Sequence, residues 1–186
     1  MIIGFIGFMQ SGKTTAAIHL QEKHGFVRVN FKDALVAEMK QNLTLTMEDM
    51  CKVMERLDFD SRNPWNIDRL FRDKPPMFRA LMQNYGTEIR RSDNEWYWIK
   101  KWSEVASETP FDIVVDDVRF INEAECIKNA GGHLVRIERT DIASAGDHPS
   151  ETELSGFSAD KTISVGKGEI EKLYQEVDVV VDLLRK

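Results

Sequence analysis

Eight residues near the N-terminus carry the strongest chemical signal in the sequence. Residues Gly7–Thr14 fit the pattern G-x-x-x-x-G-K-[ST], in which two glycines let the backbone turn tightly and point N–H groups inward. Such N–H groups hold phosphate oxygens, the lysine is a mobile cation, and the threonine hydroxyl is a magnesium ligand. The strand pattern of Ile2–Ile6 before it and a helical pattern after it favour a polyphosphate-binding P-loop over a glycine turn with a solvated lysine.

An acidic pair, Asp116 and Asp117, follows the apolar run Ile113–Val115. A carboxylate at the end of a buried strand would lie beside the P-loop and hold magnesium, directly or through water. Asp116 is the better candidate because it ends the apolar run, and capping of a surface helix is the alternative for the pair. Arg119 could pair with Asp117 or face the phosphates, and the strand pattern leaves both open.

Arginines gather around two later segments of the chain. Arg79 and Arg90 flank the residues near Gly86, and planar guanidinium groups suit a monophosphate because they offer paired donors. Both can share one helix face with Gln83 only if the helix continues through Gly86. A solvated surface position is the alternative for each arginine.

Arg136 and Arg139 stand near the end of a predicted strand and precede the irregular segment Thr140–Asp160. This segment is rich in serine, aspartate, glycine and proline, which is the composition of a mobile surface loop. An arginine on such a lid could neutralise charge on a phosphoryl group in transfer.

Strand and helix patterns alternate along the chain that must position these residues. Apolar runs predict strands at 2–6, 26–30, 112–116, 133–138 and 161–165. Helical spacing predicts helices at 11–23, 31–43, 46–57, 76–91, 96–107, 121–130 and 168–184. The alternation predicts an α/β fold with right-handed crossovers and a mainly parallel sheet covered on both faces. Ligands bind such a sheet beyond the carboxyl ends of its strands, where the P-loop and Asp116 are expected.

The composition of the chain indicates which kinds of binding partner to expect. The length of 186 residues suits one domain, and 42% hydrophobic with 30% charged residues is typical of a soluble globular protein. A net charge of -6 gives no general attraction to nucleic acid or anionic membrane, so neither partner is expected. No stretch approaches the roughly 20 apolar residues of a membrane helix, and the N-terminal run lacks a secretion signal's features. A cytoplasmic protein is predicted, with the oligomeric state open, a homodimer included.

Together, five segments resemble the bacteriophage-type deoxynucleoside monophosphate kinases of the P-loop kinase superfamily. They occur in the order Gly7–Thr14, Asn30–Leu35, Gln83–Arg90, Asp116–Glu123 and His148–Glu151, and the resemblance covers nearly the whole chain. It implies a three-layer α/β fold with a five-strand parallel sheet and helices on both faces. It implies one domain over 1–186, with an acceptor-binding region at about 31–107 and a lid at about 139–160.

The resemblance also implies the reaction and its residues. The γ-phosphate of ATP would pass to a deoxynucleoside monophosphate, giving the diphosphate and ADP, with Mg²⁺ as cofactor, in the host cytoplasm if the gene is from a phage. ATP would be held by Gly7, Gln10, Ser11, Gly12, Lys13, Thr14, Thr15 and Arg136, and Mg²⁺ by Thr14 and Asp116. The acceptor would be bound by Phe31, Lys32, Asp33, Arg79, Gln83, Thr87, Arg90 and Trp96. The catalytic set would be Lys13, Arg90, Arg119 and Arg139.

One segment departs from the resemblance. Similar kinases often carry an Ile-x-Asn-x-Gly pattern after the last strand, whereas this chain has a different sequence at Ile163–Gly168, so adenine contacts there stay open. Two other functions also fit the P-loop: a kinase for another small phosphorylated metabolite, and a nucleotide-binding switch. The absence of an Asn-Lys-x-Asp guanine motif argues against a GTP switch, which would also leave the arginine-rich region unexplained.

Overall fold

The chain divides into two compact units. The computed structural model describes residues 1–42, 71–141 and 153–185. The first unit comprises Met1–Phe31 and Ile99–Lys186, and the second is Lys32–Trp98, which falls within the segment 31–107 predicted to bind the acceptor. The helix predicted at 46–57 and the segment His148–Glu151 lie outside the described residues.

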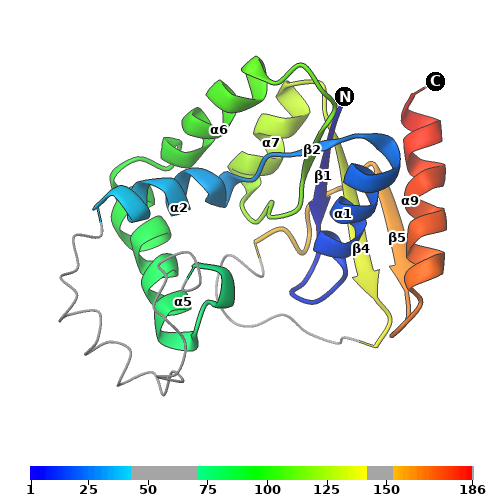
Figure 1. The fold of residues 1–186 in the computed structure, drawn as a ribbon, viewed down its shortest axis with the longest axis horizontal. Coiled ribbons are helices and arrows are strands. Elements are labelled where there is room, and N and C mark those ends of the chain that lie inside the picture. Colours follow the sequence, from blue (N-terminus) through cyan, green and yellow to red (C-terminus); the bar gives the residue numbers. More distant parts are fainter. Residues whose placement is uncertain (43–70, 142–152, 186) are drawn as a thin grey trace. The chain divides into compact units, whose positions relative to one another are not determined.

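The first unit is built on a five-stranded, all-parallel sheet in the order β2-β3-β1-β4-β5 (Figure 1). The strands are β1 (Ile2–Ile6), β2 (Val27–Arg28), β3 (Ile113–Val115), β4 (His133–Arg139) and β5 (Lys161–Val165). The predicted parallel sheet is therefore confirmed, but β2 is shorter than the predicted 26–30. Backbone contact with β3 goes on to Val29, whose N–H donates to the carbonyl oxygen of Val114, and a side chain then takes over: Asn30 Oδ1 accepts a hydrogen bond from the backbone N–H of Asp116.

Helices cover both faces of this sheet, which confirms the three layers. On one face, α1 (Lys13–His24) and α9 (Ile170–Leu184) lie side by side and pack on the sheet through Leu20 and Val177 (Figure 1). On the other, α6 (Tyr97–Glu108) and α7 (Ile121–Asn129) contribute Trp102 and Ile127 to a second apolar cluster. None of the helices in the described ranges is long and apolar enough to span a membrane.

The described residues of the second unit are mainly helical. It contains α2 (Phe31–Asn42), whose first residue belongs to the first unit, followed by α5 (Pro76–Gln83) and a π-helical segment, η1 (Asn84–Arg91). Met39, Phe71, Phe78 and Met82 form its apolar cluster.

The helix predicted at 76–91 thus continues through Gly86, but in a π-helical form. A side chain at Gly86 would bring its Cβ to 3.3 Å from Leu35 Cδ2, so glycine allows a close approach there. The Gly86 carbonyl accepts a hydrogen bond of 2.9 Å from the indole of buried Trp98. Gly86 is therefore a packing residue within a continuous helix. π-Helical turns often occur at functional sites.

Candidate active site

The order of the strands explains why the candidate residues converge. Strand β1 lies between β3 and β4: the chain leaves β1 toward β2 on one side, and after β3 it crosses to β4 on the other side. Carboxyl ends of parallel strands meet at one edge of the sheet, and ligands bind where the connection direction reverses. This edge receives the P-loop after β1, Asp116 after β3 and Arg139 at the end of β4.

The backbone of the P-loop is shaped to hold an anion. Gly7 and Gly12 have φ values of 137° and 106°, and Gln10 is left-handed with φ 64°. A Cβ at Gly7 would lie 2.2 Å from the carbonyl oxygen of Ile137, so only glycine fits there. The buried hydroxyl of Ser11 has no hydrogen-bond partner among the described residues. A buried polar group without a partner costs free energy, and a phosphate oxygen would satisfy it.

Three cations border a pocket at the P-loop. Lys13 Nζ donates hydrogen bonds of 2.6 Å to the carbonyl oxygens of Gly7 and Phe8. The pocket beside it is lined by Gly7, Phe8, Lys13, Val118, Arg119, Arg136, Leu154 and Ser155. Lysine and two arginines around a loop of backbone donors form an environment for a polyphosphate.

Asp116 and Thr14 provide adjacent oxygen atoms. Thr14 Oγ1 donates a hydrogen bond of 2.6 Å to Asp116 Oδ2, although the two residues are far apart in sequence. Hydroxyl and carboxylate oxygens are ligands that Mg²⁺ prefers, so these two residues fit that ion.

Arg28, at the end of β2, also binds this carboxylate. Its Nε and Nη2 donate hydrogen bonds of 3.0 and 2.7 Å to the two oxygens of Asp116, whose side chain is 0% exposed. An ionised carboxylate has about four lone-pair sites, so it can accept from Arg28 and still face a hydrated Mg²⁺. Arg28 could not be predicted from the sequence, because it belongs to no motif and lies in a strand of only two residues.

We expect Arg28→Leu to lower the free energy of unfolding by about 3 kcal/mol, because the buried Asp116 carboxylate loses its two-point contact with the guanidinium. Urea denaturation followed by circular dichroism measures the change. Arg185→Leu is the matched control: its ion pair with Asp112 is exposed and should contribute less than about 1 kcal/mol. Equal losses in the two variants would contradict a special role for Arg28.

Asp117 has a different function from its neighbour. Its Oδ1 accepts a hydrogen bond of 3.1 Å from the backbone N–H of Phe31, the first residue of α2. The helix-capping alternative therefore fits Asp117, and Asp116 is left as the candidate for the metal.

A buried glutamate shapes the loop that carries Arg119. Glu123 Oε2 accepts hydrogen bonds of 2.8 and 3.2 Å from the backbone N–H groups of Arg119 and Phe120. These bonds satisfy donors at the start of α7 and fix the backbone from which the Arg119 side chain reaches the pocket. Of the two alternatives for Arg119, its position in the pocket favours the phosphates.

The two arginines of β4 bind different neighbours. Arg136 Nη2 donates to the carbonyl oxygens of Leu154 and Phe157, at 2.8 and 2.6 Å, and so ties the segment before β5 to the pocket. Arg139 forms a two-point ion pair with Asp141, which raises the pKa of the arginine, and its Nη1 lies 3.4 Å from the Gln10 carbonyl oxygen. Both therefore border the P-loop.

In the second unit, Arg90 belongs to a polar cluster around Glu38. Arg90 Nη2 lies 2.6 Å from Glu38 Oε1, and the guanidinium also donates to the hydroxyl of Tyr85. Tyr85 and Tyr97 each donate a hydroxyl hydrogen bond to Glu38. Burial raises the pKa of Glu38, but the bonds from Tyr97, Tyr85 and Arg90 outweigh it, so the pKa is lowered and the carboxylate stays charged. Glu38 could not be predicted from the sequence, because it belongs to no motif.

The other predicted acceptor residues differ in exposure. Phe31 is buried, with its ring stacked on Trp102 in the first unit, so it is a core side chain. Trp96 is 48% exposed and stays available for stacking, whereas Trp98 is buried. Lys32 and Asp33 lie in the first turn of α2. On α5, Arg79 is exposed and Gln83 is the last residue, and Thr87 lies in the π-helical segment that follows. Thr15 is half-buried in the first turn of α1, and Gln10 is exposed.

Comparison with known proteins identifies the family. A family model for deoxynucleotide monophosphate kinases matches residues 69–177, more than half of the chain. A protein of Acanthamoeba polyphaga mimivirus that carries the name of a deoxynucleotide monophosphate kinase is 32% identical over 195 residues, covering 98% of this chain and 96% of that protein.

Two solved structures of kinases are matched over nearly the whole chain. Shikimate kinase from Aquifex aeolicus has a TM-score of 0.46 at 17% identity, over 98% of this chain and 96% of its own. A sugar kinase from Janibacter sp. has a TM-score of 0.48 at 13% identity, over 97% of this chain and 94% of its own. Because both TM-scores are below 0.5, the assignment rests on the two sequence matches. The P-loop kinase site thus stands in a chain that belongs to the deoxynucleotide monophosphate kinase family.

Proposed function

We propose that the first unit binds ATP with Mg²⁺ and that the second unit supplies the groups that bind the deoxynucleoside monophosphate. The P-loop supports the first half: Ser11 offers a buried hydroxyl that needs a partner, and Lys13, Arg119 and Arg136 border one pocket. Thr14 and Asp116 fit Mg²⁺, which when bound neutralises charge on the β- and γ-phosphate oxygens.

In the proposed reaction an oxygen of the acceptor's phosphate attacks the γ-phosphorus in line. The new P–O bond forms as the bond to the β,γ-bridging oxygen breaks, and ADP leaves with that electron pair. Lys13 exchanges its two carbonyl partners for phosphate oxygens, and Arg119 offers a further cation to the developing charge. The protein mainly positions and neutralises two like-charged substrates, so no covalent enzyme intermediate is needed.

The direct test is a coupled assay of ADP release with each of the four common deoxynucleoside monophosphates in turn. At least one should stimulate ADP release well above the rate without acceptor, and the same rate should fall when Mg²⁺ is chelated. No stimulation by any of them would remove the proposed substrate class. If a deoxynucleoside monophosphate only inhibits the phosphorylation of another metabolite, the protein is a kinase for that metabolite. Slow ATP hydrolysis that needs no acceptor and depends on a protein partner would favour a nucleotide-binding switch.

We expect Arg90→Ala to raise KM for the deoxynucleoside monophosphate by about 10- to 100-fold, with KM for ATP little changed. This factor corresponds to the loss of a charge-assisted hydrogen bond, which contributes about 1.5–3 kcal/mol. The Glu38 carboxylate and the two tyrosines already orient this guanidinium. The matched control is Arg91→Ala, the next residue in the same helical segment. Unchanged kinetics toward the monophosphate in Arg90→Ala would exclude Arg90 from acceptor binding.

We also propose that small molecules are the only substrates and that the protein acts in the cytoplasm. The net charge of -6 supports the first proposal, because it offers no general attraction to nucleic acid. A homodimer stays a prediction. Sedimentation equilibrium of the full chain measures its mass in solution and so tests this prediction.

A further inference from the structure

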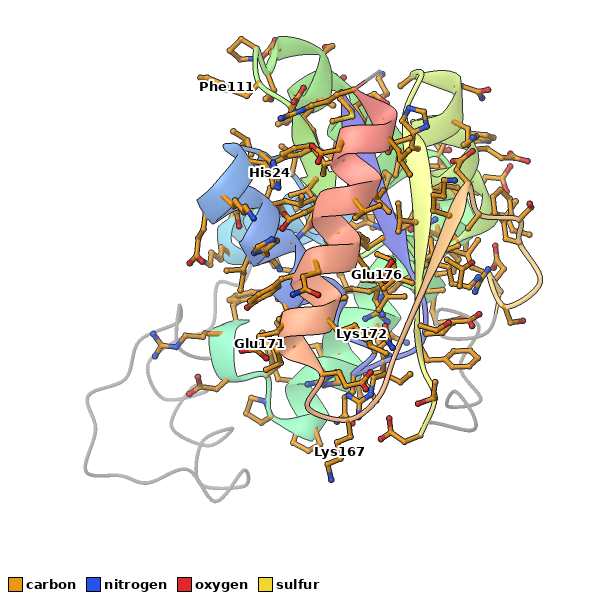
Figure 2. The ribbon with its side chains drawn as sticks, turned by 90° about the vertical axis from the view of Figure 1, so that its right-hand side faces the viewer. His24, Phe111, Lys167, Glu171, Lys172 and Glu176 are labelled. Atoms are coloured by element: carbon orange, nitrogen blue, oxygen red, sulfur yellow. The ribbon has the colours of Figure 1, made fainter. Side chains whose placement is uncertain are left out.

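Two histidines and an aspartate converge where α1 meets α9, in the first unit. The Nε2 atoms of His19 and His24 lie 2.8 and 2.7 Å from the same oxygen of Asp178. The three ligand atoms lie within 4.8 Å of one another. Figure 2 shows His24 at the end of α1, beside α9. No step of the proposed kinase reaction uses these residues.

We propose that His19, His24 and Asp178 form a binding site for a late transition-metal dication, for which Zn²⁺ is the probe. Two imidazoles and one carboxylate form a ligand set that zinc accepts, with water in the fourth position. The side chains are 12%, 12% and 21% exposed, so the cluster is largely sheltered yet open to an entering ion.

The geometry is close to that of a zinc site. Ligand atoms about 2.0–2.1 Å from a tetrahedral zinc lie about 3.3 Å apart, so the observed contacts need to open by only about 0.5 Å. Each neutral imidazole must move its proton from Nε2 to Nδ1, which solvent exchange allows. The His19 ring is stacked on Tyr174 at 4.2 Å between centroids, which fixes the plane of one ligand.

Lys23 is the competitor for this site. Its Nζ donates a hydrogen bond of 2.7 Å to the other oxygen of Asp178. The lysine side chain is 56% exposed, so its ammonium can move into solvent when a dication arrives. The proposal therefore predicts that removing the Lys23 charge strengthens metal binding.

The cluster is separate from the proposed magnesium site. Lys13 and Thr14 begin α1, whereas His19 and His24 follow Thr14 by about 8 and 15 Å along the helix axis. A metal here would join two helices that are distant in sequence, so it would bind the folded chain and stabilise it by mass action.

The test is calorimetric titration of Zn²⁺ into the full chain, stripped with chelator and free of nucleotide, with thermal melting as a second measurement. We expect one equivalent to bind at the cluster and to raise Tm. His24→Gln keeps an amide donor for Asp178 but loses the imidazole nitrogen, so it should weaken binding by at least about tenfold and abolish the Tm rise. Lys23→Met should bind more tightly than the unmodified chain.

His133→Gln is the matched control, since it removes a histidine elsewhere in the first unit. It should bind Zn²⁺ like the unmodified chain. Binding that is equal in His24→Gln and the unmodified chain, or that is lost only in His133→Gln, would overturn the proposal. A Tm that Zn²⁺ leaves unchanged in both the unmodified chain and Lys23→Met would do the same.

Discussion

Lys13→Ala should lower kcat by about 10³-fold, within the range found when a single group that stabilises a transition state is removed. Lys13 is the mobile cation of the P-loop, and its ammonium is already held 2.6 Å from the Gly7 and Phe8 carbonyl oxygens. In the proposed reaction, ATP would replace these carbonyl oxygens with charged phosphate oxygens, whose charge shifts during transfer. The loss should therefore appear in kcat more than in KM for the acceptor, and the coupled assay measures both.

The fold should survive this change, since Lys13 is half-buried at the beginning of α1 and contributes to neither apolar cluster of the sheet. Circular dichroism and Tm check this point. Lys172→Ala, on the exposed face of α9, is the matched control and should keep full activity (Figure 2). A Lys13→Ala protein that folds and retains turnover within about tenfold would refute the proposed function of Lys13.

Asp116→Asn should lower kcat by about 10²- to 10³-fold at ordinary Mg²⁺ concentrations. The amide keeps the volume of the carboxylate but loses the charge that faces Thr14 and Arg28. Arg28 is then left with an uncompensated positive charge beside the metal's position, which repels the dication. We therefore expect the Mg²⁺ concentration for half-maximal activity to rise, and part of the activity to return at high Mg²⁺.

Asp117→Asn is the matched control, because the adjacent carboxylate accepts from the start of α2 instead. It should leave the Mg²⁺ dependence unchanged. If both variants shift the Mg²⁺ dependence equally, the assignment of Asp116 alone to the metal is wrong. If neither does, Mg²⁺ is held without this acidic pair.

Arg28 adds a structural reason for Asp116 to stay ionised and in place. A buried carboxylate needs a partner, and the two-point contact with a guanidinium fixes both of its oxygens. The pair links β2 to β3 at the edge of the sheet where the substrates are expected. Mutation of Arg28 should therefore affect stability first and Mg²⁺ use second.

The sequence by itself determined the order of elements and the P-loop. Strand β1 has the predicted bounds, because a buried central strand requires a continuous apolar run. Strand β5 also matches 161–165, although it lies at the edge of the sheet and buries only Ile163 and Val165. The P-loop could be predicted since its function depends on glycines and one lysine at fixed spacing, all within eight residues. Helix ends agreed to within about two residues where the apolar spacing was regular.

Only the tertiary structure decided which distant side chains meet. Arg28 and Asp116 are separated by 88 positions, and Glu38 and Arg90 meet across the second unit, so neither pair leaves a local pattern. The two neighbouring aspartates also have different partners in the structure. Asp117 accepts a hydrogen bond from the first residue of α2, whereas Asp116 accepts from Arg28 and Thr14. It kept the helix continuous through Gly86, because Leu35 and Trp98 pack around that residue. A motif records contacts that the chain makes with its near neighbours, whereas these contacts depend on strand order and on helices that meet only in the folded state.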